Sequence, residues 1–106
     1  MKKLFRLTPE AKAGLRDILL DIADDSPETA ERLRGEFYEA LRRLGESPGI
    51  GHYHEELLDQ RYRFWNFYSY VVVYAWQQRP IRIIAVVHGA RDLGVFFSLR
   101  MTSSDD

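Results

Sequence analysis

The most constraining feature of the sequence is an apolar run, Ile81 to Val87, which leads directly into an ionisable cluster, His88 to Asp92. Branched aliphatic side chains dominate the run, which is typical of a β-strand. Side chains alternate along a strand, so Arg82 and His88 are expected on one face, while both faces stay largely apolar. Such a strand is normally interior to its sheet. We therefore expect a central strand whose chemistry gathers at its end, where Gly89 permits a sharp turn.

Two amphipathic helices are predicted in the first half of the chain. The first runs from Pro9 to about Asp24 with Thr8 as its cap, and the second starts at Pro27, capped by Ser26 or Asp25. Their apolar residues recur at three and four positions: Ala11, Leu15, Ile18, Ile22, then Ala30, Leu33, Phe37, Leu41, Leu44. The second helix should end near residues 45–49, and the short connection makes the pair an antiparallel hairpin.

Strands are predicted on both sides of this hairpin. A short one covers Lys3–Leu7, and a β-hairpin pairs Arg61–Trp65 with Tyr70–Trp76 around a turn at residues 66–69. A final short helix is expected within Asp92–Met101. The fold class is α+β, in the order β-α-α-β-β-β-α, with the helical hairpin packed on a small, mainly antiparallel sheet. We expect residues 1–101 to form one domain and residues 102–106 to form a disordered tail.

Composition excludes several functions. The 106 residues include no cysteine, which rules out disulfides, thiolate zinc sites and a cysteine nucleophile. No segment approaches the roughly 18 apolar residues of a membrane span, so we expect a soluble, cytoplasmic protein without a membrane partner. His52 and His54, with Glu55 and Glu56, lie in a glycine-containing loop without a third placed ligand. We therefore expect no metal and no cofactor.

Charge is distributed unevenly along the chain. Residues 1–60 carry nine Lys/Arg and thirteen Asp/Glu, whereas residues 61–104 carry six arginines and one acid. Guanidinium groups suit planar anions, so the strand half favours an anionic partner, the alternative being ordinary sheet-edge arginines. Leu20 and Tyr38 fall off the apolar stripes of the helices, which makes them candidates for a partner surface. The acidic helical half suits a basic amphipathic partner.

Four segments together resemble the ParE branch of the RelE/ParE toxins, over nearly the whole chain. They are Leu7-Thr8-Pro9-Glu10-Ala11 followed by Leu15 and Ile18, Ser47-Pro48-Gly49-Ile50-Gly51, the Arg63–Tyr74 hairpin, and Ile83–Asp92. The resemblance implies a small bacterial toxin of a type II toxin–antitoxin system, of the kind associated with plasmid stabilization. It further implies neutralisation by a ParD-like antitoxin, encoded beside the toxin, whose C-terminal segment wraps around it.

ParE-type toxins act on DNA gyrase, whereas RelE-type relatives are ribosome-dependent messenger ribonucleases. The resemblance therefore implies a growth-inhibiting gyrase binder, with no sequence-specific DNA binding of its own. The target-binding candidates are Arg61, Arg63, Arg82, His88, Arg91 and Asp92, and the antitoxin-binding candidates are Leu20 and Tyr38. A third reading is a module that binds the antitoxin but is no longer toxic.

The ribonuclease alternative needs a group to take the 2′-hydroxyl proton, a group to protonate the leaving oxygen, and cations for the phosphate. Arg63, Arg82, His88 and Arg91 are the candidates for these roles. The set is incomplete, because RelE-type enzymes carry lysines before this hairpin and a C-terminal tyrosine, and here no lysine follows Lys12 and no tyrosine follows Tyr74. A purely structural role also stays open, in which Arg91 pairs with Asp92 and His88 binds a backbone carbonyl.

Overall fold

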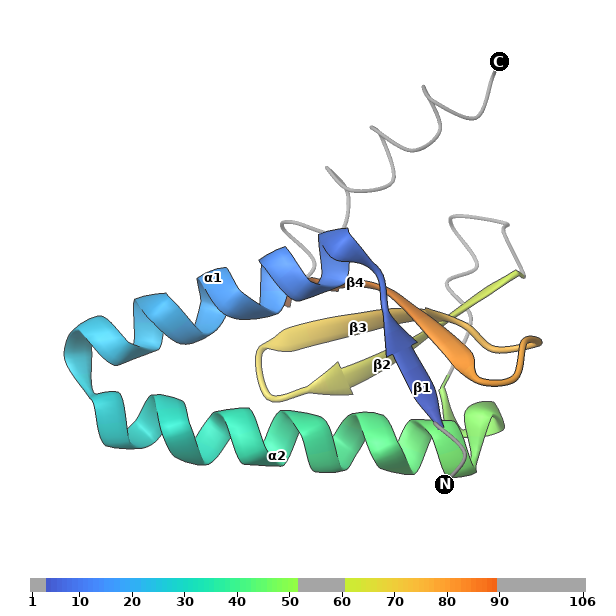
Figure 1. Ribbon diagram of the computed structural model, residues 1–106, viewed down its shortest axis with the longest axis horizontal. Helices are drawn as coiled ribbons and strands as arrows, with labels where there is room; N and C mark the ends of the chain where they lie inside the picture. The colour runs from blue at the N-terminus through green and yellow to red at the C-terminus, as the bar shows by residue number, and fades with distance from the viewer. Residues whose placement is uncertain (1–3, 52–60, 90–106) are drawn as a thin grey trace, which may run out of the picture.

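The computed structural model describes residues 4–51 and 61–89. Within them, the chain forms a helical hairpin on one face of a four-stranded sheet (Figure 1). The elements in chain order are β1 (Phe5–Leu7), α1 (Pro9–Asp25), α2 (Pro27–Glu46), a short 3-10 helix η1 (Pro48–Ile50), β2 (Tyr62–Phe67), β3 (Tyr70–Ala75) and β4 (Ile81–Val87). The predicted α+β fold and its element order are confirmed. The helix expected at 92–101 and the tail at 102–106 lie outside the described residues.

The sheet has the order β1-β4-β3-β2, so β4 is an interior strand, as its apolar sequence predicts. β1 runs parallel to β4, and the other neighbouring strands pair antiparallel. The turn between β2 and β3 is shorter than expected, because Phe67 still pairs with Tyr70 and only Tyr68 and Ser69 remain in the turn. Tyr68 has a positive φ of 56° and donates its hydroxyl to Glu36 of α2 at 3.0 Å. That hydrogen bond raises the pKa of Tyr68.

Both predicted helix caps are present. The Thr8 side chain accepts a hydrogen bond from the Ala11 amide at 3.1 Å, and Ser26 accepts one from the Thr29 amide at 3.2 Å. Proline follows each cap, where its missing N–H leaves no hydrogen bond unmade. The Thr8 hydroxyl also donates to the carbonyl of Ile84 at 3.0 Å, so the start of α1 is tied to the middle of β4.

The contact between Thr8 and Ile84 coincides with a β-bulge. Val73 pairs with Ala85 but Tyr74 pairs with Ile83, which leaves Ile84 as an extra residue in β4. A bulge of this kind shifts the alternation of side chains by one position. Residues 81–83 therefore face the sides that strict alternation predicts. From residue 85 onward, each side chain of β4 faces the opposite side to the one predicted.

Two apolar clusters lie on the two faces of the sheet. The helix-side cluster contains the buried residues Ala11, Leu15, Phe37, Leu41, Leu44, Val72, Tyr74, Ile81, Ile83 and Val86. The opposite cluster contains Phe64, Val71, Val73, Ala75, Ile84 and Ala85. Phe37 at the centre of α2 is fully buried, and its ring centroid lies 4.5 Å from that of Phe67 and 5.7 Å from that of Tyr70. The helical hairpin and the β2–β3 hairpin therefore share one core.

Candidate functional site

The helical hairpin carries a groove of about 360 Å³ between α1 and α2. Its lining includes both antitoxin-binding candidates, Leu20 from α1 and Tyr38 from α2. Their side chains remain 57% and 38% exposed, which is unusual for large apolar groups, and Leu15, Leu19 and other apolar residues continue the surface between them. The structure thus brings together two residues that are 18 positions apart in the sequence.

Charged side chains surround this groove. Its lining contains the basic residues Lys12, Arg16 and Arg34 and a single acid, Glu31. The Arg34 guanidinium lies over the Tyr38 ring, 5.5 Å from the ring centroid, and the Phe5 and Tyr38 ring centroids are 6.3 Å apart. These contacts hold the half-exposed Tyr38 ring in place. The groove is therefore apolar inside and positively charged at its rim.

Arg63, a candidate for target binding and for catalysis, binds the protein's own backbone. It pairs with Tyr74 across β2 and β3 and lies half-buried, with its guanidinium 4.4 Å from the centroid of the Trp76 ring. Its Nη1 donates to the carbonyl of Gly51 at 2.7 Å and to that of Gly49 at 3.4 Å. These contacts hold η1 and the adjoining Gly51 against the sheet, so Arg63 fixes local structure.

Tyr74 holds the same segment, η1 and Gly51. This fully buried side chain donates its hydroxyl to the Pro48 carbonyl at 2.6 Å and accepts from the Gly51 amide at 3.0 Å. Hydrogen bonds with both Arg63 and Tyr74 therefore fix Ser47–Gly51, one of the four resembling segments.

Arg82 and His88 do not share a face, contrary to the expectation from simple alternation. The bulge at Ile84 turns His88 to the helix side, where it lines a cleft of about 390 Å³ with Asp17 and Asp21 of α1. There His88 is exposed and meets the Tyr70 ring edge-on at a centroid distance of 5.2 Å. Arg82 remains on the opposite face of β4.

The catalytic candidates are consequently dispersed. Five residues lie between Arg82 and His88 in extended backbone, which places the two roughly 20 Å apart. Arg63 is engaged with the carbonyls of Gly49 and Gly51. Proton transfer and charge stabilisation at one phosphate need groups within hydrogen-bond reach of the same atoms. Arg63, Arg82 and His88 do not form such a set in the described part of the chain, and Arg91 and Asp92 lie outside it.

Further arginines lie near the start of β4, at the end of the sheet opposite to His88. Arg61 precedes β2 and its guanidinium lies 5.4 Å from the centroid of the Tyr62 ring. Arg82 does not line the cleft of His88. It lines a second pocket, together with Arg6 of β1 and Arg79 of the β3–β4 turn. Neither Arg6 nor Arg79 is among the candidates predicted from the sequence. The alternation of Phe5, Arg6 and Leu7 predicts that Arg6 lies on the face of the strand opposite to the two apolar residues. The proximity of Arg6 and Arg79 to Arg82 depends on the strand order, which the sequence pattern does not give.

The residues that the structure describes contain no group of three or more His, Asp or Glu side chains placed to hold a metal ion. His52, His54, Glu55 and Glu56 lie outside those residues. Neither α1 nor α2, the long helices of the described ranges, has the length and apolar content that crossing a bilayer requires.

Comparison with known families agrees with the fold. The family model described as the ParE toxin of the type II toxin-antitoxin system, parDE, matches residues 5–93. No curated protein matches the chain. The matched range begins at β1, passes through the helical hairpin and all of the sheet, and extends beyond β4. The chain belongs to the ParE toxin family, and it is a toxin component of a type II toxin–antitoxin system with a cognate antitoxin as its partner.

Proposed function

We propose that this toxin acts in the bacterial cytoplasm by binding and inhibiting DNA gyrase, without catalysing a reaction itself. The observation that carries this proposal is the dispersion of the catalytic candidates, since Arg82 and His88 face opposite sides of the sheet. An arginine-rich strand end is instead suited to binding a macromolecule through charged contacts. Arg61 and Arg82 are the contacts of choice, because both are exposed.

A supercoiling assay tests this proposal. Purified toxin in excess over gyrase is expected to abolish supercoiling of relaxed plasmid, and combining Arg61→Ala with Arg82→Ala should raise the half-inhibitory concentration by about tenfold. Arg32 is an exposed arginine on α2, so the Arg32→Ala variant is the matched control and should inhibit gyrase like the wild-type toxin. Full supercoiling activity at high toxin concentration, together with new transcript ends in a translating extract, would establish the ribonuclease alternative instead.

For neutralisation, we propose that a ParD-like antitoxin places an amphipathic segment in the groove between α1 and α2. Support comes from the exposed apolar side chains of Leu20 and Tyr38 in a single groove, since contiguous exposed apolar surface is a mark of an interaction site. The groove runs between two helices, which is the geometry in which an apolar helix face docks.

The rim charges favour an acidic antitoxin segment. Three basic residues and one acid surround the groove, although residues 1–60 as a whole are acidic. The acids of the helices lie largely outside the lining: Asp17 lies 3.9 Å from the exposed Arg16, and Glu39 and Glu46 bind Arg42. Local charge, rather than the balance of the whole half, decides which partner is attracted. The basic partner expected from the overall charge is therefore replaced in this proposal by an acidic one.

Substitution of Leu20 tests the groove. The Leu20→Glu variant should bind the antitoxin encoded beside the toxin about ten- to a hundredfold more weakly, because burial of a leucine at an interface contributes about 1.5–3 kcal/mol. Ile50→Glu is the matched control, since Ile50 is 46% exposed but lies outside the groove. Calorimetric titration measures both affinities. Equal affinities for the two variants and the wild type would exclude this groove as the binding site.

A further inference from the structure

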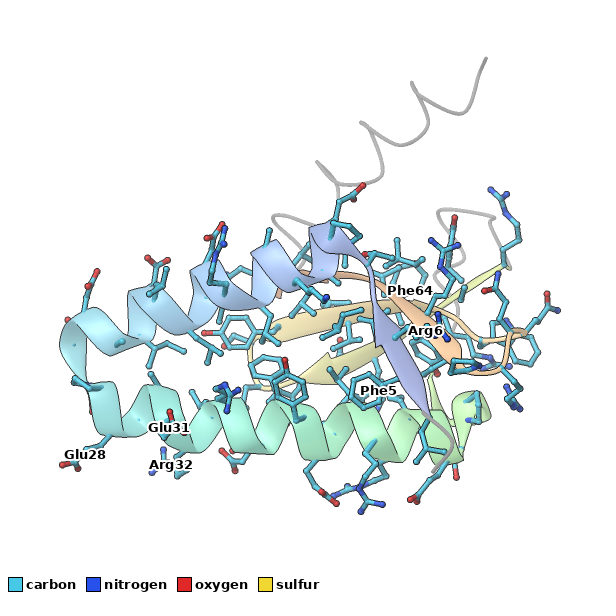
Figure 2. The ribbon with its side chains drawn as sticks, viewed as in Figure 1. Phe5, Arg6, Glu28, Glu31, Arg32 and Phe64 are labelled. Atoms are coloured by element: carbon cyan, nitrogen blue, oxygen red, sulfur yellow. The ribbon has the colours of Figure 1, made fainter. Side chains whose placement is uncertain are left out.

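Two arginines face each other across the only parallel strand pair among the described residues. Arg6 of β1 is in register with Arg82 of β4. The flanking residues Phe5, Leu7, Ile81 and Ile83 all pack into the helix-side core, so both arginines point to the opposite face. Like charges placed directly opposite each other destabilise a sheet unless something compensates them. Figure 2 shows Arg6 on β1, close to the strands and far from the end of α2 that bears Arg32.

A third arginine completes this arrangement. Arg79 in the β3–β4 turn donates its Nη1 to the carbonyls of Trp76 at 3.1 Å and Gln78 at 3.2 Å, which fixes its guanidinium beside the turn. Arg6, Arg79 and Arg82 line one pocket of about 420 Å³, whose remaining lining is Leu7, Thr8, Pro9, Gln78 and Pro80. We call it the arginine pocket.

No acidic residue lines the arginine pocket. The ion pairs found among residues 4–51 and 61–89 involve Arg16, Arg32 and Arg42, and none involves an arginine of this pocket. Thr8 and Pro9 bring the start of α1 to its wall, and Glu10, the acid of the first helical turn, is not part of the lining. Three arginines thus line one concave site, and no acid in its lining neutralises them.

We propose that the arginine pocket binds a phosphate group. A single carboxylate is satisfied by one guanidinium in bidentate contact, whereas a phosphate presents several charged oxygens and can bind two or three at once. The pocket is large enough for a phosphate together with part of the group that carries it. The phosphate comes from a free polyphosphate or nucleotide, or from the backbone of a nucleic acid strand. This inference does not rest on gyrase inhibition or on antitoxin binding.

Titration with two probes tests the proposal. Pyrophosphate represents the free phosphate, and a short single-stranded oligonucleotide without terminal phosphates represents the backbone. At low salt, we expect saturable binding of at least one probe with a dissociation constant below about 1 mM, weakened about tenfold by Arg6→Ala and by Arg82→Ala. Binding should also weaken as salt is raised.

Three further results complete the test. Arg82→Lys keeps the charge but not the bidentate fork, so it should recover only part of the affinity. Arg32→Ala should bind like the wild type, and circular dichroism checks that each variant is folded. Binding of pyrophosphate alone assigns the site to free phosphates, and binding of the oligonucleotide assigns it to a nucleic acid strand. The proposal is overturned if neither probe binds saturably, or if folded Arg6→Ala and Arg82→Ala variants bind as tightly as the wild type.

Discussion

Replacement of Phe37 by alanine is expected to lower the free energy of unfolding by about 3–5 kcal/mol. Phe37 has no exposed surface, and its ring contacts Phe67 and Tyr70, which come from the two strands of the β2–β3 hairpin. Loss of the ring leaves a cavity between α2 and that hairpin and removes the aromatic contacts as well. Since domains of this size are stable by about 5–15 kcal/mol, the loss is a large part of the total.

The neighbouring residue supplies the control. Tyr38 lies next to Phe37 on α2 but remains 38% exposed, so Tyr38→Ala should cost no more than about 1 kcal/mol. Urea unfolding followed by the fluorescence of Trp65 and Trp76 measures both variants. Tyr38→Ala should lose antitoxin affinity while keeping its stability, and Phe37→Ala should lose stability. Equal destabilisation by the two substitutions would contradict the assignment of one residue to the core and the other to the groove.

The second large effect concerns two glycines in the helices. Gly14 of α1 lies so close to β4 that an added Cβ would meet the Val86 carbonyl oxygen at 2.6 Å, a distance that requires backbone movement. Alanine gains up to about 1 kcal/mol in helix propensity, but separating α1 from β4 costs more, so Gly14→Ala should destabilise the protein by about 1–3 kcal/mol.

Gly35 of α2 should respond with the opposite sign. It is exposed, and an added Cβ would find nothing within 4 Å, so only the gain in helix propensity remains. Gly35→Ala is expected to stabilise the protein by about 0.5–1 kcal/mol. Urea midpoints of the two variants give the comparison directly. Stabilisation by both substitutions would mean that α1 does not approach β4 as closely as described.

Local signals made the helices and their caps predictable. Thr8 and Ser26 precede prolines, and the apolar period of three and four places Phe37 and Leu41 on the buried side. The end of β2 was predicted less well, because Phe67 continues the strand through its pairing with Tyr70 and its packing on Phe37. That contact depends on tertiary structure, and no local pattern in the sequence encodes it.

The bulge in β4 could not be predicted for a similar reason. Nothing in the apolar residues 83–87 distinguishes Ile84, whose carbonyl accepts a hydrogen bond from Thr8, a residue 76 positions earlier. Strict alternation, which does not take the bulge into account, predicts His88 on the same face as Arg82. The same limitation applies to the arginine pocket, because its assembly requires β1 to pair with β4. Leu20 and Tyr38 are separately predicted as partner-surface candidates by their position off the apolar stripes of the helices. The helical hairpin brings both into one groove, which the sequence pattern does not show.

Single thiols can show whether the antitoxin occupies the groove between α1 and α2, as proposed above. The sequence has no cysteine, so Leu20→Cys and Ile50→Cys each introduce one unique thiol at an exposed position. The rate of reaction with a thiol reagent is measured with and without an antitoxin whose own cysteines are replaced by serine. We predict that the antitoxin slows reaction at position 20 by at least about tenfold and leaves position 50 unchanged. Unchanged reactivity at position 20 in a saturated complex would contradict the account.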